Sequence, residues 1–461
     1  MSVSESTLAP EALWTRGQRM LGSRLVSGTF RATRLAAVIV VPVAAVALAF
    51  GPNAQRLHPA TLAAAVWFVA LRSSFGEPHL VARGTTVIAA TGTLTGLAML
   101  SLLLFWLPGI GVGAVQLLLM AAAVFATAAV VAAQTQRFAS RRRLLLVGAD
   151  EGIEQLLREL ARHPHLPFDV IGVVAHGPAT SIGGAPRVGD IPELHAILGE
   201  EQPDLVVLGD EPGREEALAQ VLETASARDV RVMDVHHLHE YAFGKVPVEH
   251  LSPAWFMGVL HLYQRPYSRL VKRMFDLVVA SVALVLLAPV LLAVAVAVRA
   301  SSRGPVFFRQ RRLGEGGKLF SICKFRTMVD GAEAPGAAVW AAVDDARVTG
   351  VGRMLRRTRL DELPQLWNVL RGDMSIVGPR PERPEFLELL QETVPFWTRR
   401  HLVKPGITGW AQVCRGYAAD AMATADKLAY DLYYLKYRSL LFDITIAFRT
   451  VGIVFTGFGS R

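Results

Sequence analysis

Five apolar segments, the second of them short for a membrane span, limit what this chain can fold into. Four of them precede residue 134, near residues 35–51, 60–71, 86–106 and 111–133. The fifth runs from Leu277 through Val298 without a charged residue. Hydrophobic residues make up 52% of the 461 positions, and a charge-free run of about 20 residues is long enough to cross a bilayer as a helix. The sequence therefore predicts a membrane protein, not a wholly soluble one.

The charges between these segments predict the side of the membrane on which each loop lies. Five arginines are spread over the N-terminal arm, residues 1–34, in a pattern unlike that of a signal peptide. Arg72 and Arg83 follow the second segment, and Arg141–Arg143 follow the fourth, whereas the other two loops carry only Arg56. Lys and Arg are enriched in cytoplasmic loops. We therefore expect a four-helix transmembrane bundle over 35–136. The N-terminus and all residues after the bundle are expected in the cytoplasm.

Residues 137–235 have a different pattern, in which short apolar runs alternate with amphipathic stretches. This alternation is typical of βαβ units and predicts a small Rossmann-like domain with a parallel sheet. The strands are predicted at Leu144–Val147, Val170–Val174, Asp204–Leu208 and Val230–Met233, and the helices at Gly152–Arg162, Ile191–Leu198 and Glu215–Ala227.

Two features of this region are weak indicators of ligand binding. The stretch Gly148–Gly152 stands where a dinucleotide-binding loop would begin, but it lacks the three-glycine spacing. A structural or regulatory domain is therefore favoured over cofactor binding. His236, His237, His239 and His250 follow in a predicted linker, 236–265, without the regular spacing and carboxylate partners of a metal site.

The fifth apolar segment conflicts with the charge rule if it crosses the membrane completely. Lys272 and Arg273 precede it, and five arginines follow between Arg299 and Arg312. A full crossing would carry this second basic cluster to the outer face. Pro289 lies near the middle, where a proline removes a helix hydrogen bond and favours a kink. A re-entrant helix over 275–299, broken at Pro289, reconciles these observations; an ordinary spanning helix that tolerates its proline is the alternative.

Two adjacent carboxylates, Asp361 and Glu362, lie within an arginine-rich block, Arg356–Gln365. Pro364 suits the first turn of a helix, which would place both acids at its N-terminus. There the helix dipole and the arginines favour ionised carboxylates. Such groups can attack phosphorus or bind Mg²⁺, although an isolated Asp-Glu pair is more commonly a simple helix cap.

Further blocks surround the acid pair in a fixed order. They comprise Gly304–Gly314, Phe320–Met328, Asn368–Glu382, Lys404–Val413 and Tyr430–Tyr434. Alternating apolar and basic residues in the first two predict a strand pair that presents cations. Together, the blocks closely resemble the bacterial sugar transferases of the monotopic polyprenol-phosphate phosphoglycosyl transferase type. The resemblance covers residues 266–461, and the preceding bundle and α/β domain look like the long form of that family.

The resemblance implies a fold, a reaction and roles for individual residues. It implies a C-terminal α/β catalytic domain on a re-entrant membrane helix, at the cytoplasmic face of the bacterial inner membrane. The implied reaction moves a hexose-1-phosphate from a UDP-sugar to undecaprenyl phosphate, releases UMP and begins exopolysaccharide, capsule or O-antigen synthesis. Asp361 would be the nucleophile and Glu362 a ligand of Mg²⁺. The expected phosphate or substrate contacts are Lys324, Arg326, Arg380 and Asp431.

Two positions depart from the family pattern. Ala288 precedes Pro289 where the family often has serine, so a hydroxyl that would help bend the helix is missing. Cys414 replaces the asparagine that usually follows the Trp-Ala-Gln-Val run, which leaves nucleotide or sugar contacts there open. The only other cysteine is Cys323, and the two form neither a disulfide framework nor a zinc pattern.

Other classes of protein remain to be weighed. A nucleic-acid-binding protein is disfavoured because the net charge of +9 is diffuse and no aromatic RNA-binding motif is present. A membrane-bound nucleotide-sugar dehydratase would need a glycine-rich loop and a Tyr-x-x-x-Lys motif; Tyr241 and Lys245 have that spacing, but Gly244 lies between them. A non-enzymatic assembly protein would not need the intact acid pair. The sequence does not specify the sugar, for which glucose is favoured and galactose comes next, and a homodimer is possible.

Overall fold

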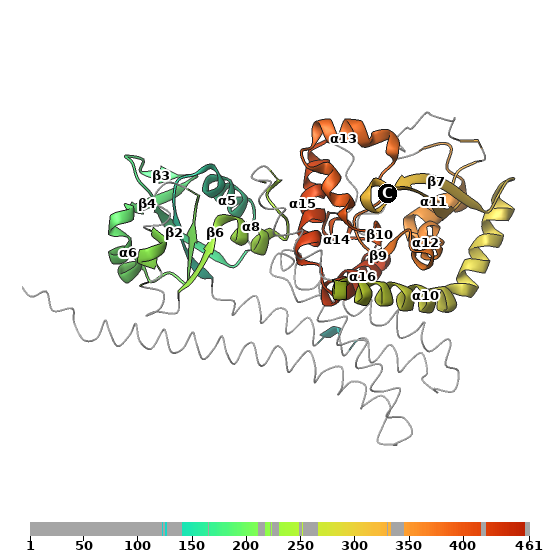
Figure 1. Cartoon of the computed structure of the whole chain (residues 1–461), viewed down its shortest axis with the longest axis horizontal. Helices are drawn as coiled ribbons and strands as arrows, with labels where there is room; N and C mark the ends of the chain where they lie inside the picture. Colours follow the sequence, from blue (N-terminus) through green and yellow to red (C-terminus); the bar gives the residue numbers. More distant parts are fainter. Residues whose placement is uncertain are drawn as a thin grey trace, which may run out of the picture.

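The computed structural model describes two domains of the chain. The described residues are 141–164, 166–210, 217–221, 223, 230–248, 251, 266–329, 331–332, 345–415 and 421–456, with 122, 125 and 126. The expected N-terminal arm and four-helix transmembrane bundle fall almost entirely outside these residues. In Figure 1 the α/β domain and the C-terminal domain lie side by side, with helices α8 and α15 facing each other where the domains meet.

The first domain is built on a six-stranded sheet in the order β3-β4-β2-β1-β5-β6. All neighbouring strands are parallel except β3 and β4, which form an antiparallel edge. Successive residues of the central strand β1 face opposite sides: Leu144 and Leu146 belong to one hydrophobic core, and Leu145 belongs to the other. The elements are β1 (Arg142–Val147), α5 (Glu151–Arg162), β2 (Phe168–Val174), β3 (Ser181–Ile182), β4 (Ala185–Gly189), α6 (Leu194–Glu201), β5 (Leu205–Leu208), β6 (Arg231–Asp234) and α8 (Val235–Phe243).

The parallel α/β prediction for this domain is confirmed, and its strand order is that of a Rossmann-type sheet. In the loop after β1, however, the side chain of Asp150 occupies the free backbone N–H groups. One carboxylate oxygen of Asp150 accepts the backbone N–H of Ile153 and caps α5, and the other accepts the backbone N–H of Asp210 after β5. A negative charge already occupies the helix N-terminus where a dinucleotide phosphate would bind, which agrees with the preference for a structural or regulatory domain.

The domain boundary expected at residue 235 needs correction. Residues 235–243 form helix α8 and are not a linker, and Val235, Leu238 and Phe243 belong to the core of the α/β domain. Asp234 caps this helix by accepting the backbone N–H of His237. The sequence predicts a linker here because the polar histidines interrupt the apolar residues that form the buried face of α8.

The C-terminal domain packs short helices around two small strand pairs. Its main core contains the buried indoles of Trp397 and Trp410. Strands β7 and β8 form the predicted antiparallel pair, and β9 and β10 form a parallel pair. The elements are α10 (Pro266–Ser301), β7 (Phe307–Leu313), β8 (Leu319–Phe325), α11 (Gly350–Thr358), the 3₁₀ turn η6 (Leu360–Glu362), α12 (Gln365–Arg371), β9 (Ser375–Val377), α13 (Leu387–Thr393), the 3₁₀ helix η8 (Trp397–Leu402), β10 (Gly406–Thr408), α14 (Trp410–Arg415), α15 (Ala421–Tyr437) and α16 (Leu440–Thr456).

Helix α10 is the one described helix long and apolar enough to cross a membrane. It runs along the base of the domain in Figure 1 and then turns sharply upward, and Pro289 is its internal proline. Both legs contact the same domain. Asp276 accepts hydrogen bonds from the hydroxyl of Ser375 and from a β9 backbone N–H, whereas Val298 packs in a cluster with Leu355 of α11. A straight helix would separate residues 276 and 298 by about 33 Å.

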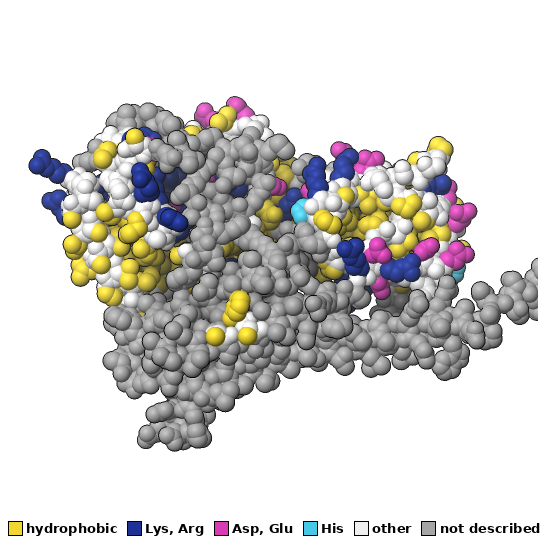
Figure 2. Space-filling model, turned by 180° about the vertical axis from the view of Figure 1, so that it is seen from behind, with side chains coloured by type: hydrophobic (Ala, Val, Ile, Leu, Met, Phe, Trp, Pro, Cys, Tyr) yellow, Lys and Arg dark blue, Asp and Glu magenta, His cyan; other side chains and the backbone are white. Residues whose placement is uncertain are grey.

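The outward face of α10 is apolar. Figure 2 shows hydrophobic side chains gathered over the end of the molecule that contains this helix. The exposed large side chains on α10 are Leu270, Met274, Val278, Val282, Val285, Leu292 and Val296. An unbroken apolar face on a bent helix is suited to contact with lipid.

The two domains are joined by buried polar contacts. The carboxylate of Glu240 on α8, which is 1% exposed, accepts hydrogen bonds from Lys436 at 2.7 and 2.9 Å and from the Tyr437 hydroxyl at 2.5 Å. The indole N–H of Trp410 donates to the carbonyl of Gly244 at 2.7 Å. These contacts attach the end of α8 directly to helices of the C-terminal domain.

Candidate active site

The acid pair lies in a tight connection between two helices. Helix α11 ends at Thr358, and Arg359 adopts a left-handed backbone with φ of 61°. The 3₁₀ turn η6 follows, and α12 begins at Gln365, directly after Pro364. Left-handed backbone is uncommon for a residue with a side chain, and here it reverses the chain so that Asp361 and Glu362 point into the domain. Both are 8% exposed.

Glu362 is held by two cations from distant parts of the sequence. Lys324 of β8 donates to Oε1 at 3.1 Å. Arg380, in the turn after β9, donates to Oε1 at 2.6 Å and to Oε2 at 3.3 Å. The fold therefore brings together four of the expected site residues, Asp361, Glu362, Lys324 and Arg380, around one buried carboxylate.

The two acids have opposite electrostatic environments. Burial alone would raise the pKa of Glu362, but Arg380 and Lys324 outweigh it and hold that pKa well below its ordinary range. Burial raises the pKa of Asp361, and the charge of Glu362 raises it further. Neighbouring carboxylates commonly diverge in this way. The surroundings thus favour the ionised form of Glu362 and disfavour the ionised form of Asp361.

Asp431 lies deeper than the acid pair and is paired with an arginine that the sequence analysis did not single out. Its carboxylate, 1% exposed, accepts from Nε of Arg400 at 3.0 Å and from another guanidinium nitrogen at 2.7 Å. Arg400 also donates to the backbone carbonyl of Arg380 at 3.0 Å and to Glu382 at 3.3 Å. Asp431 therefore reaches the site through Arg400, which supports the backbone of Arg380.

Arg326 is the expected site residue that the structure places elsewhere. Its guanidinium donates to the backbone carbonyl and the hydroxyl of Ser302, at 2.8 and 2.9 Å. It thereby secures the chain just after α10. Arg326 follows Lys324 by two residues, so on an extended strand both would face one side; here β8 ends at Phe325, between them.

Helix α12 is fixed at both of its sides, which in turn fixes the acid pair before it. The amide of Asn368 accepts from the backbone N–H of Cys323 and donates to the carbonyl of Ser321, so it joins α12 to β8. Arg273 of α10 donates to the carbonyls of Val369 and Leu370, each at 2.7 Å. A guanidinium at the last turn satisfies open carbonyls and complements the helix dipole.

The residues present suit Mg²⁺ in one respect. Mg²⁺ in phosphate-transferring sites is commonly held by one or two carboxylates, substrate phosphates and waters, and Asp361 with Glu362 provides such a carboxylate pair. Among the described residues no cluster of three or more His, Cys, Asp or Glu side chains is suited to hold a metal. A bound ion would therefore depend on oxygens from the substrate.

Two structurally important residues were not predicted from the sequence, Arg400 and Arg273. Arg400 stands in the run Arg399-Arg400-His401, which is typical of a solvated surface, yet it is 2% exposed and stacks on Trp397 at 4.4 Å. The tryptophan three residues earlier was the available signal. Arg273 was counted only as a flanking charge of the apolar segment, and its helix-capping role depends on residues about a hundred positions away.

Comparison with known proteins shows a family and several relatives. The bacterial sugar transferase family matches residues 267–457. A UDP-N-acetylgalactosamine-undecaprenyl-phosphate N-acetylgalactosaminephosphotransferase of Aeromonas hydrophila is 43% identical over 232 residues, 50% of this chain and 54% of that protein. A UDP-glucose:undecaprenyl-phosphate glucose-1-phosphate transferase of Escherichia coli K12 is 37% identical over 331 residues, 69% of this chain and 68% of that protein. The exopolysaccharide production protein ExoY of Sinorhizobium fredii is 39% identical over 210 residues, 42% of this chain and 90% of that protein.

Together, the bent apolar helix and the buried acid pair among cations define a membrane-associated protein equipped for phosphate chemistry. The chain belongs to the bacterial sugar transferase family. It spans about half the length of the Aeromonas relative, whereas 42% of the chain covers 90% of ExoY.

Proposed function

We propose that this protein transfers a hexose-1-phosphate from a UDP-sugar to undecaprenyl phosphate, with release of UMP. This would be the first membrane step of exopolysaccharide, capsule or O-antigen synthesis. The observation that carries the proposal is the pairing of Glu362 with Lys324 and Arg380 beside the less strongly paired Asp361. This arrangement provides a nucleophile, a fixed negative charge and two phosphate-binding cations in one buried place.

The proposed reaction has two displacement steps. A carboxylate oxygen of Asp361 attacks the sugar-linked phosphorus, and the bond to the bridging oxygen breaks with UMP as the leaving group. The product is an acyl-phosphate that carries the sugar. A phosphate oxygen of undecaprenyl phosphate then attacks the same phosphorus, releases Asp361 as a carboxylate and forms undecaprenyl-diphosphate-hexose. Arg380 and Lys324 neutralise charge on the transferring phosphoryl group in both steps.

Mg²⁺ is the cofactor that we propose, with Glu362 as its protein ligand. When bound, it would neutralise the diphosphate and stabilise the leaving group. Glu362 would then exchange part of its pairing with Arg380 and Lys324 for the ion. This leaves those two cations available for phosphate oxygens.

The membrane arrangement that we propose follows from helix α10. Its two legs both pack on the C-terminal domain, which supports a re-entrant helix over 275–299 broken at Pro289. The catalytic domain, 266–461, would then lie on the cytoplasmic face of the inner membrane, where UDP-sugars are available. The bundle over 35–136 would span the membrane ahead of it. Undecaprenyl phosphate would enter from the bilayer beside α10.

Glucose is the sugar that we favour. The Escherichia coli relative is named as a glucose-1-phosphate transferase, and the Aeromonas relative is named for N-acetylgalactosamine. Galactose follows glucose in our order of preference. The donor panel that tests this choice should therefore contain the UDP derivatives of all three.

The test is to incubate the purified full chain, in lipid nanodiscs with Mg²⁺, with a UDP-sugar labelled in the sugar. Before lipid acceptor is added, wild-type protein should retain label after denaturation and release one UMP for each adduct. Asp361→Asn should retain none. Adding undecaprenyl phosphate should discharge the label into lipid. An unlabelled wild-type protein that turns over only when both substrates are bound together would exclude the covalent mechanism.

A further inference from the structure

Two partly buried cations near the acid pair form no ion pair with any carboxylate that the structure describes. Arg312, near the end of β7, donates to the backbone carbonyl of Pro381 at 3.2 Å and to the side-chain carbonyl of Gln310 at 2.6 Å. Its Nε is buried without a hydrogen-bond partner among the described residues. Lys427, on α15, forms no hydrogen bond or ion pair with any residue in the described part of the chain. We call these residues the outer cation pair.

The outer cation pair converges on one place. Arg312 holds the carbonyl of Pro381, which lies between Arg380 and Glu382. Lys427 lies one helical turn before Asp431, so both face the same side of α15, and Asp431 is bound there by Arg400. Both outer cations act on Glu382, whose burial would raise its pKa but whose pKa is lowered by Arg400, Lys427, Arg312 and Arg380.

Glu382 alone does not balance these charges. Its Oε1 already accepts from Arg400 at 3.3 Å, and its single negative charge faces several cations. Burying a cation without a counter-charge is costly. Accordingly, burial lowers the pKa of Lys427, and burial together with Arg380 lowers the pKa of Arg312 to about 10. Such a group is stabilised when an anion binds, and this place therefore suits a phosphate.

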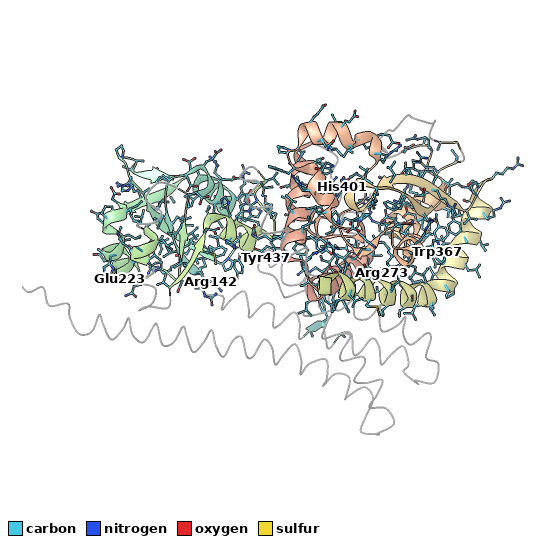
Figure 3. All side chains as sticks on the ribbon, in the orientation of Figure 1. Arg142, Glu223, Arg273, Trp367, His401 and Tyr437 are labelled. Carbon is cyan, nitrogen blue, oxygen red and sulfur yellow. The ribbon has the colours of Figure 1, made fainter. Side chains whose placement is uncertain are left out.

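The position within the domain identifies which phosphate. Figure 3 shows His401, next to Arg400 in the chain, on the side of the domain away from Arg273 and the first leg of α10. Figure 1 shows β7 and α13 on that same side, while α10 and α16 lie at the opposite base. The lipid acceptor approaches from the α10 side, so a phosphate bound near the end of β7, on the opposite side, belongs to the soluble donor.

We propose that Arg312 and Lys427 form a second anion subsite that binds the nucleotide-side phosphate of the donor, the group that leaves as UMP. This assignment rests on the proposed function, because it divides the donor diphosphate between two subsites. The sugar-linked phosphate is held by Lys324 and Arg380 next to Asp361, and the other by the outer cation pair. As the bridging bond breaks, its electron pair passes to the UMP phosphate, and the outer cations stabilise that added charge.

The experiment compares Lys427→Met and Arg312→Gln with matched controls. Lys318→Met and Arg311→Gln remove the same charges nearby, and both control residues are exposed. Each outer-cation variant should raise the KM for UDP-sugar and the Kd for UMP by roughly 10- to 100-fold, as expected for a charge-assisted hydrogen bond. The KM for undecaprenyl phosphate should stay within about twofold, a change worth only a few tenths of a kcal/mol.

The readouts separate failure of this inference from failure of the proposed function. UMP binding is measured by calorimetry on the full chain and needs no turnover. If the wild type neither turns over any UDP-sugar nor binds UMP, the proposed function itself fails. If the wild type is active but the variants keep wild-type affinity for UMP, the second subsite is wrong. A selective rise in the KM for undecaprenyl phosphate would instead assign the outer cation pair to the lipid phosphate and overturn the proposal.

Discussion

The guanidinium of Arg400 binds the carboxylate of Asp431 through two nitrogen atoms, at 2.7 and 3.0 Å, with both side chains almost completely buried. The pair connects η8 to α15, and through its other contacts Arg400 reaches the backbone of Arg380. The backbone of Arg380, the arginine that we propose binds phosphate, is thus supported by an ion pair that forms no hydrogen bond with Asp361 or Glu362 in the described part of the chain. This relationship makes Arg400 a positioning residue.

Replacing only one residue of this ion pair should lower the free energy of unfolding more than replacing both residues together. Arg400→Met leaves the buried Asp431 without its ion-pair partner, and Asp431→Leu leaves Arg400 with only the longer contact to Glu382. Removing one partner of a buried ion pair costs about 3–5 kcal/mol in comparable pairs, and we expect the cost of Asp431→Leu to be the smaller of the two. The double variant should be less destabilised than the sum of the two, by 1 kcal/mol or more. Thermal unfolding of the three variants in detergent measures this coupling. Strict additivity would show that the two residues act independently.

Asp361→Asn should separate stability from activity. Burial and the charge of Glu362 disfavour the ionised Asp361 and raise its pKa, so a neutral isostere should leave the Tm unchanged or raise it by a few degrees. Turnover should fall by at least about 10³-fold, because the amide is no longer a nucleophile. Parallel melting curves and initial rates provide the measurement.

Glu362→Gln is the matched control for that comparison. It also neutralises one acid, but it removes the counter-charge of Lys324 and Arg380. The Tm should therefore fall, in contrast to the result with Asp361→Asn. A shift of the same sign in both variants would contradict the assignment of opposite environments to the two acids.

Much of the α/β domain could be predicted because its signals are local. The runs that form β1 and β5 are apolar and buried over four consecutive residues, whereas β2 and β6 combine apolar residues with an acid or an arginine. The hairpin β3–β4 was not predicted. Its strands are two and five residues long, and they join through Gly183-Gly184, so it carries no periodic signal.

The candidate site was predictable only where charge alone marked it. Lys324, Glu362 and Arg380 stand in distinctive blocks, and the fold brings them together as their chemistry requires. The role of Arg400 could not be predicted because its partner Asp431 is 31 residues away in the sequence. A buried arginine and a solvated one look the same in a sequence, since burial depends on long-range packing and not on neighbours. Among the described residues, Arg326 donates hydrogen bonds to Ser302 and not to Glu362, because β8 ends before it where the sequence pattern shows no end.

The joint between the domains should be stabilised by Glu240. Replacing it with leucine removes the acceptor of Lys436 and Tyr437, and Lys436 is then left without this carboxylate at a partly buried place. We expect a loss of roughly 1–3 kcal/mol, which is less than for a fully buried pair because Lys436 retains some exposure. Hydrogen exchange of α8 and α15 should rise together, since they share the joint.

Glu200→Leu, an exposed acid on α6, controls for the change in surface charge. It should leave the exchange of both helices unchanged. Faster exchange of α8 without any change in α15 would mean that Glu240 supports only its own domain. The double variant Glu240→Leu/Lys436→Met should be less destabilised than the two single variants combined, for the same reason as at Arg400.

His401 should make the protein less stable as the pH falls from 7 towards 4. Burial, and to a smaller extent the charge of Arg400, lower the pKa of His401 from 6.5 to about 4. Well above its unfolded pKa of 6.5 the imidazole is neutral in both the folded and the unfolded state, so it contributes no pH dependence there. Below pH 6.5 His401 is protonated in the unfolded chain but stays neutral in the folded protein. The free energy of unfolding therefore declines until the pH reaches the folded pKa. The shift corresponds to a loss of about 3 kcal/mol over this window.

Replacing His401 with leucine should remove this decline. The Nε2 atom of His401 is buried without a partner among the described residues, so the substitution removes a polar atom that gains nothing from burial. The Tm at pH 7 should be equal to or higher than that of the wild type, and the advantage of the variant should grow steadily down to about pH 4. Melting curves at half-unit pH steps measure both slopes. Parallel curves for wild type and variant would mean that His401 titrates in the folded protein as it does in the unfolded chain.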